Sequence, residues 1–232
     1  MKNRFLFLLL PLACFVSCET TGTTVKTSST VHAGPVKRNF ISSYRGMTKE
    51  EGLLNGDALV RKADPKTLNK YTKVIVEDVR VIPSRTSSGT EKTATRAESK
   101  ILADQFESAL RKELGQHYEL TSRRGANTLT VRAALTELRP SNPALFALNY
   151  APYVGIAMTG VKLATGKTPG SGSTSFEAEV LDSLSRRQLY AIVDHSQGSK
   201  IQFTGLDKWG HSGSAMRLWS RKIRTGIQAK TR

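Results

Sequence analysis

Stretches of alternating apolar and polar residues recur along the chain, and each of them predicts a β-strand. Residues 73–82 are dense in β-branched side chains and end before a proline, which predicts a strand closed by a turn. Residues 117–121 and 129–138 predict two strands joined by the sequence SRRGAN. Residues 175–182 and 188–195 predict a hairpin with SLSRR as its turn.

Two segments repeat apolar residues every three or four positions, which is typical of amphipathic helices. The first begins with Thr95 and Glu98 at the spacing of a capping box, and Gly115 stands where a left-handed cap is expected. Its apolar positions are Ile101, Leu102, Phe106, Ala109, Leu110 and Leu114. The second covers residues 214–227 and places one apolar stripe on Met216, Trp219, Ile223 and Ile227.

The order of these elements along the chain predicts the fold class. One strand, one helix, two strands, a further pair of strands and a final helix favour an α+β fold. We expect an antiparallel or mixed sheet with helices packed on one face, plus an apolar insertion. Residues 37–232 have the size and composition of a single domain.

The apolar insertion covers about residues 144–165, and it is uncharged until Lys162. It is nearly as apolar as a membrane span but is interrupted by one asparagine, one proline and two glycines. Three interpretations remain open: a buried or interfacial helical hairpin that covers the sheet, a surface that enters a bilayer or meets a partner protein, and a transmembrane helix. The candidate residues for apolar contact are Tyr150, Tyr153, Ile156 and Met158.

The N-terminus has the features of an export signal. Lys2 and Arg4 precede an apolar run of roughly eleven residues, which fits a secretory signal but is too short for a membrane span. Ser17 before Cys18 resembles a lipobox, so we expect a signal peptide over residues 1–17 and lipidation of Cys18. The other cysteine would leave with the signal, which suits an oxidising compartment. A simple secretory signal is the alternative.

After Cys18 the chain is rich in threonine and serine, so residues 18–36 are expected to form a flexible tether. Glu19 follows the cysteine, where aspartate is the familiar signal for retention in the inner membrane. We therefore expect a lipid-anchored protein of the outer membrane whose domain faces the periplasm.

The chain is strongly basic, with a formal net charge of +16. An exported protein rarely meets nucleic acid, so no nucleic-acid partner is expected. Its anionic partners would be lipid head groups, the phosphates of lipopolysaccharide or acidic polymers, unless the basic surface is simply solvated. The candidate anion contacts lie on the last predicted helix, away from its apolar stripe: Arg217, Arg221, Lys222 and Arg224.

No catalytic arrangement is visible in the sequence. Asp194 and His195 are adjacent in a predicted strand, so they point to opposite faces and cannot form an Asp–His pair. Neither Gly-x-Ser-x-Gly nor His-Glu-x-x-His occurs, and the four histidines lack the spacing of metal ligands. We therefore expect a protein that is not an enzyme and that holds no metal and no cofactor.

Five segments together resemble the bacterial lipoproteins grouped as domain of unknown function 3313. They are FISSYRGMTKEEG, DPKTLNKYTKVIVEDVRV, LTELRPSNPALFAL, FEAEVLDSLSRRQLYAIVDHSQG and LDKWGHSGSAMRLWSRKI. The resemblance implies a lipid-anchored envelope protein and supplies no catalytic residues to transfer. One difference is Ser185-Arg186, where relatives tend to have Thr-Gly in the hairpin turn.

These observations favour a non-enzymatic outer-membrane lipoprotein that binds or scaffolds another component of the cell envelope. The alternative is direct binding of anionic lipid or lipopolysaccharide through the basic C-terminal helix. The two hypotheses differ in their response to salt, because only the charge-driven interaction weakens steeply as ionic strength rises.

Overall fold

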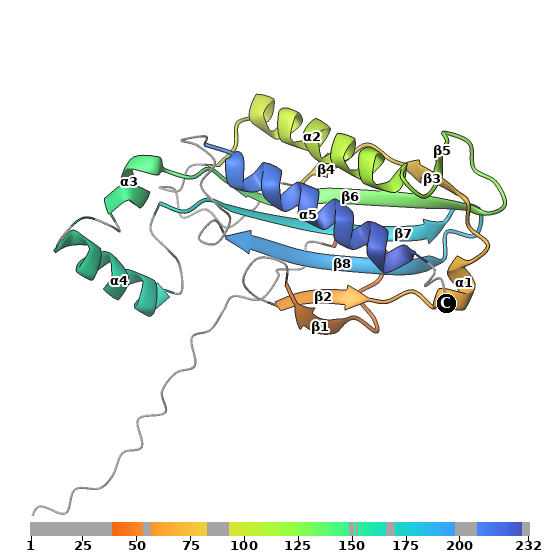
Figure 1. Cartoon of the computed structure of the whole chain (residues 1–232), viewed down its shortest axis with the longest axis horizontal. Coiled ribbons are helices and arrows are strands. Elements are labelled where there is room, and N and C mark those ends of the chain that lie inside the picture. The colour runs from red at the N-terminus through yellow and green to blue at the C-terminus, as the bar shows by residue number, and fades with distance from the viewer. Residues whose placement is uncertain are drawn as a thin grey trace, which may run out of the picture.

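A mixed sheet of eight strands forms the centre of the computed structural model (Figure 1). The strand order is β1-β2-β8-β7-β6-β3-β5, and β4 pairs with β6 beside β3. The neighbouring pairs β1-β2, β2-β8, β8-β7 and β7-β6 are antiparallel. Strands β3 and β4 pair with β6 in parallel, and β5 pairs with β3 in parallel. The expected α+β fold with an antiparallel or mixed sheet is therefore confirmed as a mixed one.

The structure describes residues 39–52, 57–82, 93–148, 151, 153–165, 170–197 and 208–228. The strands are β1 (Thr48–Glu51), β2 (Asp57–Arg61), β3 (Lys73–Val76), β4 (Arg80–Val81), β5 (Glu119–Leu120), β6 (Thr128–Arg139), β7 (Ser173–Asp182) and β8 (Gln188–Gln197). The helices are α1 (Pro65–Leu68), α2 (Arg96–Leu114), α3 (Pro143–Ala147), α4 (Val154–Thr165) and α5 (Gly210–Ile227). The expected signal peptide, the tether, Cys18 and Tyr150 lie outside the described residues.

Helices α2 and α5 cover one face of the sheet side by side (Figure 1). Their apolar stripes meet the aromatic side chain of Phe176 from β7, whose ring stacks on Trp219 with centroids 4.3 Å apart. Phe106 of α2 meets the same ring edge-on at 5.7 Å. All three side chains are fully buried, and each such side chain stabilises the fold by about 1.5–3 kcal/mol. The predicted stripe of α5 is confirmed, and that of α2 is confirmed except at Ile101, which lies on the surface.

The start of α2 is as predicted, but its end is not. Thr95 and Glu98 form a capping box, with the Thr95 hydroxyl accepting from the Glu98 backbone N–H. Gly115 has φ −62°, so the predicted left-handed cap is wrong. The chain continues instead as a right-handed turn, which brings Tyr118 to the end of α5, where its hydroxyl donates to the Ile227 carbonyl at 2.8 Å.

The predicted strand over residues 73–82 is divided into β3 and β4. Val76 pairs with Val131, and Arg80 pairs with Ala134. The four residue steps from Val76 to Arg80 therefore lie opposite only three steps of β6. The additional residue interrupts the ladder as a bulge does, which is why the prediction of one continuous strand is wrong. The strand predicted at residues 117–121 shrinks to β5, which pairs with β3 and not with β6.

The hairpin of β7 and β8 is confirmed, and Arg186 in its turn has φ +59°. Phe176, Ala178 and Val180 of β7 belong to the core under the helices. Glu177 and Glu179 therefore face the opposite side of the sheet, yet both are fully buried. Residues 39–47, which we call the strap, cover them there.

The apolar insertion forms α3 and α4, which lie beyond one end of the sheet (Figure 1). The insertion connects β6 to its antiparallel neighbour β7, so it leaves and re-enters the sheet at the same end. It does not cover the sheet, and the expectation of a hairpin that does so is wrong. Among the helices that the structure describes, none combines the length and the hydrophobicity needed to cross a bilayer. We refer to residues 143–148 and 153–165 as the arm.

Candidate functional site

Apolar side chains of the arm are strongly exposed. Tyr153 is 87% exposed, Ile156 75% and Leu163 71%, whereas Met158 is partly buried. Further exposed apolar residues of the arm are Leu145, Leu148, Val154 and Val161. The predicted contact residues Tyr153 and Ile156 thus lie on the surface.

The exposed residues of α4 lie on two opposite sides of the helix. At about 100° per residue, Val154 and Val161 fall on one side and Ile156 and Leu163 on the other. A helix with exposed apolar residues on opposite sides is normally enclosed by other protein or by lipid. The twelve residues of α4 extend roughly 18 Å, against about 30 Å for the hydrocarbon core of a bilayer.

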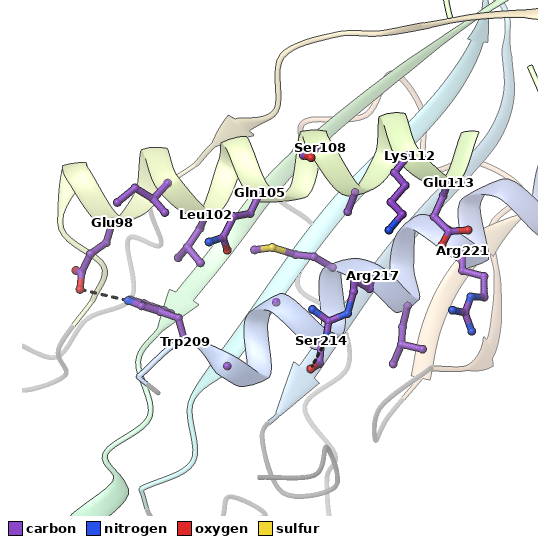
Figure 2. A pocket seen from close by; sticks show the side chains of 16 residues that line it. Glu98, Leu102, Gln105, Ser108, Lys112, Glu113, Trp209, Ser214, Arg217 and Arg221 are labelled. Carbon is purple, nitrogen blue, oxygen red and sulfur yellow. Dashed lines mark hydrogen bonds between the residues drawn. The ribbon is translucent and has the colours of Figure 1, made fainter. Parts of the chain in front are cut away.

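A second surface feature is a groove of about 970 Å³ between α2 and α5, shown in Figure 2. The first half of α2 contributes Ile101 and Leu102, and α5 contributes Met216 and Leu218. Cationic side chains reach the groove from both helices: Lys112 from α2, and Arg217 and Arg221 from α5. The groove is therefore apolar along one part and basic along another.

Both acidic residues of the groove are neutralised by basic partners. Glu98 accepts a hydrogen bond from the Lys208 ammonium at 2.6 Å, which, with further bonds from Thr95 and Trp209, lowers the pKa of Glu98 to about 2. Glu113 accepts from the Arg224 guanidinium at 3.1 Å. In the described part of the chain, neither Lys112, Arg217 nor Arg221 forms an ion pair, and Arg217 donates only to the Ser214 hydroxyl at 3.0 Å.

The four anion contacts predicted on the last helix are not equivalent in the structure. Arg217 and Arg221 line the groove together. Arg224 is held by Glu113, and Lys222 donates to the backbone carbonyl of Glu51 at 3.2 Å on the β1 side. Sequence reasoning missed Lys112, because the face of α2 that meets α5 cannot be read from the periodicity of α2 alone.

The strap side of the sheet holds a serine and a histidine in contact. Ser175 Oγ and His195 Nδ1 are 2.7 Å apart, and Glu137 Oε2 accepts from the same serine at 3.4 Å. In a nucleophilic triad the carboxylate orients the imidazole, whereas Glu137 here binds the hydroxyl. Asp194 lies on the other face, where it accepts from the Trp219 indole at 3.2 Å, which confirms the predicted separation from His195.

The described residues contain no group of three or more histidine, cysteine, aspartate or glutamate side chains that could hold a metal ion. This concerns only those residues, and Cys18 is not among them. Within the described residues, the arm and the groove both have features that suit binding.

The mixed sheet with two helices on one face defines an α+β domain. A family model described as "Protein of unknown function (DUF3313)" matches residues 37–223, so the chain belongs to this family. No curated protein matched the chain.

Solved structures with a similar arrangement include the PelC dodecamer from Paraburkholderia phytofirmans. PelC is 14% identical, with a TM-score of 0.41, over 75% of this chain and 99% of its own. A DUF4136 family protein from Bacteroides thetaiotaomicron is 12% identical, with a TM-score of 0.39, over 75% of this chain and 97% of its own.

Proposed function

We propose that this protein is a non-enzymatic lipoprotein of the outer membrane whose arm docks on another protein of the cell envelope. The observation that carries the proposal is the exposure of Ile156 and Leu163 on one side of α4 and of Val154 and Val161 on the other. Leaving such a helix in water is unfavourable, since roughly 25 cal/mol is gained for each Å² of apolar surface that is buried. A partner that encloses the arm would gain this free energy.

A protein cleft suits α4 better than a bilayer surface does. Helices that lie flat in the interface bury one apolar face and keep a charged face in water. With apolar residues on opposite sides, α4 would leave one of them exposed in any flat orientation. It is also too short to span the hydrocarbon core. Two small residues on one side of the helix, Ala157 and Gly160, permit the close approach of another backbone.

The lipid anchor is the part of this proposal that rests on the sequence pattern at Cys18. A modified cysteine at the mature N-terminus would hold the domain at the membrane through the tether of residues 18–36. Mass spectrometry of the mature N-terminus from membrane fractions tests this part: we expect an acylated Cys18. An unmodified N-terminus at any other residue would contradict the anchor.

Docking is tested by comparing proteins that co-purify with the natural chain, with Ile156→Asp/Leu163→Asp and with Leu184→Asp. Leu184 is a matched control, because it is 63% exposed but lies in the β7–β8 turn. We expect an envelope protein that is retained by the natural chain and by the control, is lost from the arm variant, and persists at moderate salt.

Two results would contradict the docking proposal. One is an unchanged set of co-purifying proteins in the arm variant. The other is arm-dependent binding to protein-free phosphatidylcholine vesicles when no protein partner is recovered. That result would mean that the arm binds the bilayer and not a protein.

A further inference from the structure

Three cations line the groove between α2 and α5, and within the described residues none of them forms an ion pair. The two acidic residues of the groove, Glu98 and Glu113, are bound by Lys208 and Arg224 instead. In Figure 2, Lys112 points from α2 toward α5, while Arg217 and Arg221 extend from α5. The two arginines are four residues apart on one helix, where like charges repel each other. A bound phosphate group would reduce this repulsion and would accept several charge-assisted hydrogen bonds.

The same groove offers apolar surface at a distance from these charges. Ile101 is 56% exposed although it lines the groove, and Leu102 and Met216 are buried beside it. The eleven residue steps from Ile101 to Lys112 correspond to about 16 Å along α2. A free phosphate at the basic part would leave Ile101 in water, whereas an acyl chain extending from the phosphate could cover it.

We propose that this groove binds a phosphate-bearing lipid, with the phosphate at Lys112, Arg217 and Arg221 and part of an acyl chain against Ile101. The groove volume of about 970 Å³ lies within the range of small-molecule sites. The site lies on the helix layer and not on the arm, so it is independent of the docking proposed above.

The test is calorimetric titration of the full chain with water-soluble short-chain phosphatidylglycerol. We expect saturable binding that weakens as salt is added, and little binding of short-chain phosphatidylcholine. Replacing Arg217→Gln and Arg221→Gln together should weaken binding at least about tenfold, because two charge-assisted contacts are lost. Lys112→Gln, on the other helix, should weaken it in the same direction.

A matched control removes the same charge elsewhere. Arg123 and Arg124 are exposed in the turn after β5, and Arg123→Gln/Arg124→Gln should bind as the natural chain does. The groove variant should not unfold at a lower temperature than the natural chain, since neither of its arginines forms an ion pair within the described residues and their mutual repulsion is removed.

Three results would overturn the proposal. They are no binding of phosphatidylglycerol, an equal loss of lipid affinity in the groove variant and in Arg123→Gln/Arg124→Gln, or binding of inorganic phosphate as tight as that of the lipid. The last would reveal a site for a bare anion only. The variant Ile156→Asp/Leu163→Asp should keep its lipid binding, which separates the failure of this proposal from the failure of docking.

Discussion

The hydroxyl of Tyr44 donates a hydrogen bond to Glu177 Oε2 at 2.6 Å and joins the strap to the centre of the sheet. The Phe40 backbone N–H donates to the same carboxylate oxygen at 3.0 Å, and the Ser42 N–H donates to Glu179 at 2.8 Å. Carboxylates buried in a sheet are costly unless donors surround them. The strap therefore replaces part of the water that Glu177 and Glu179 lose, so the described domain begins no later than residue 39.

Replacing Tyr44→Phe should destabilise the protein by about 1–3 kcal/mol, because the buried carboxylate of Glu177 loses a donor while the ring is kept. Unfolding in urea measures the change. Tyr153→Phe is the matched control, since the Tyr153 side chain is 87% exposed, and its midpoint should equal that of the natural chain. Equal midpoints for both variants would show that the Tyr44 hydroxyl does not hold the strap.

Two glycines of α5 should respond to alanine in opposite ways. Alanine normally stabilises a helix relative to glycine by about 0.5–1 kcal/mol. At Gly226 the added methyl would lie 2.5 Å from Cε2 of the buried Tyr190, so Gly226→Ala should destabilise by about 1–3 kcal/mol. At Gly213 the nearest atom is the end of Arg217 at 3.8 Å, so Gly213→Ala should stabilise. A thermal melt in which both variants shift upward would contradict the packing of α5 on β8.

The contact between Tyr71 and Asp182 makes the stability of the fold depend on pH in the acidic range. The Tyr71 hydroxyl donates to Asp182 at 2.6 Å and, with donors from Ser185 and Leu184, lowers the pKa of Asp182 from 3.8 to about 2. In the unfolded chain the Asp182 carboxyl has its ordinary, higher pKa and so holds its proton more tightly. The stabilisation from this contact is therefore complete above that unfolded pKa and is lost as pH falls from about 4 to about 2.

Tyr71→Phe should remove much of that dependence. The difference in unfolding free energy between the natural chain and this variant should be constant near neutral pH and should shrink below about pH 4. Urea midpoints at several pH values measure it, and the other carboxylates cancel in the difference. A difference that stays constant down to about pH 2 would contradict the role of Tyr71.

Local patterns predicted those parts of the fold that depend on neighbouring residues. The Thr95–Glu98 capping box, the apolar stripe through Trp219 and the β7–β8 hairpin all follow from spacing over a few residues. The bulge between Val76 and Arg80 could not be predicted, because it depends on the register with β6.

The two surfaces were only partly predictable. The sequence identified the apolar character of the arm, but composition does not say whether such a segment covers the sheet or projects from it. Arg217 and Arg221 were predicted from the helical stripe of α5, whereas Lys112 joins them only through the packing of α2 on α5. The strap over Glu177 was missed because hydrogen bonds between residues 137 positions apart leave no local pattern. Lipidation of Cys18 stays a prediction.

The most direct test of docking is photo-crosslinking in intact cells, with a photoreactive amino acid placed at Ile156 or, as the control, at Leu184. Both positions are exposed, at 75% and 63%, so reactivity with solvent and bystander proteins should be similar. We expect one envelope protein to be crosslinked from position 156 and not from position 184. Attachment only to phospholipid, or the same products from both positions, would contradict it.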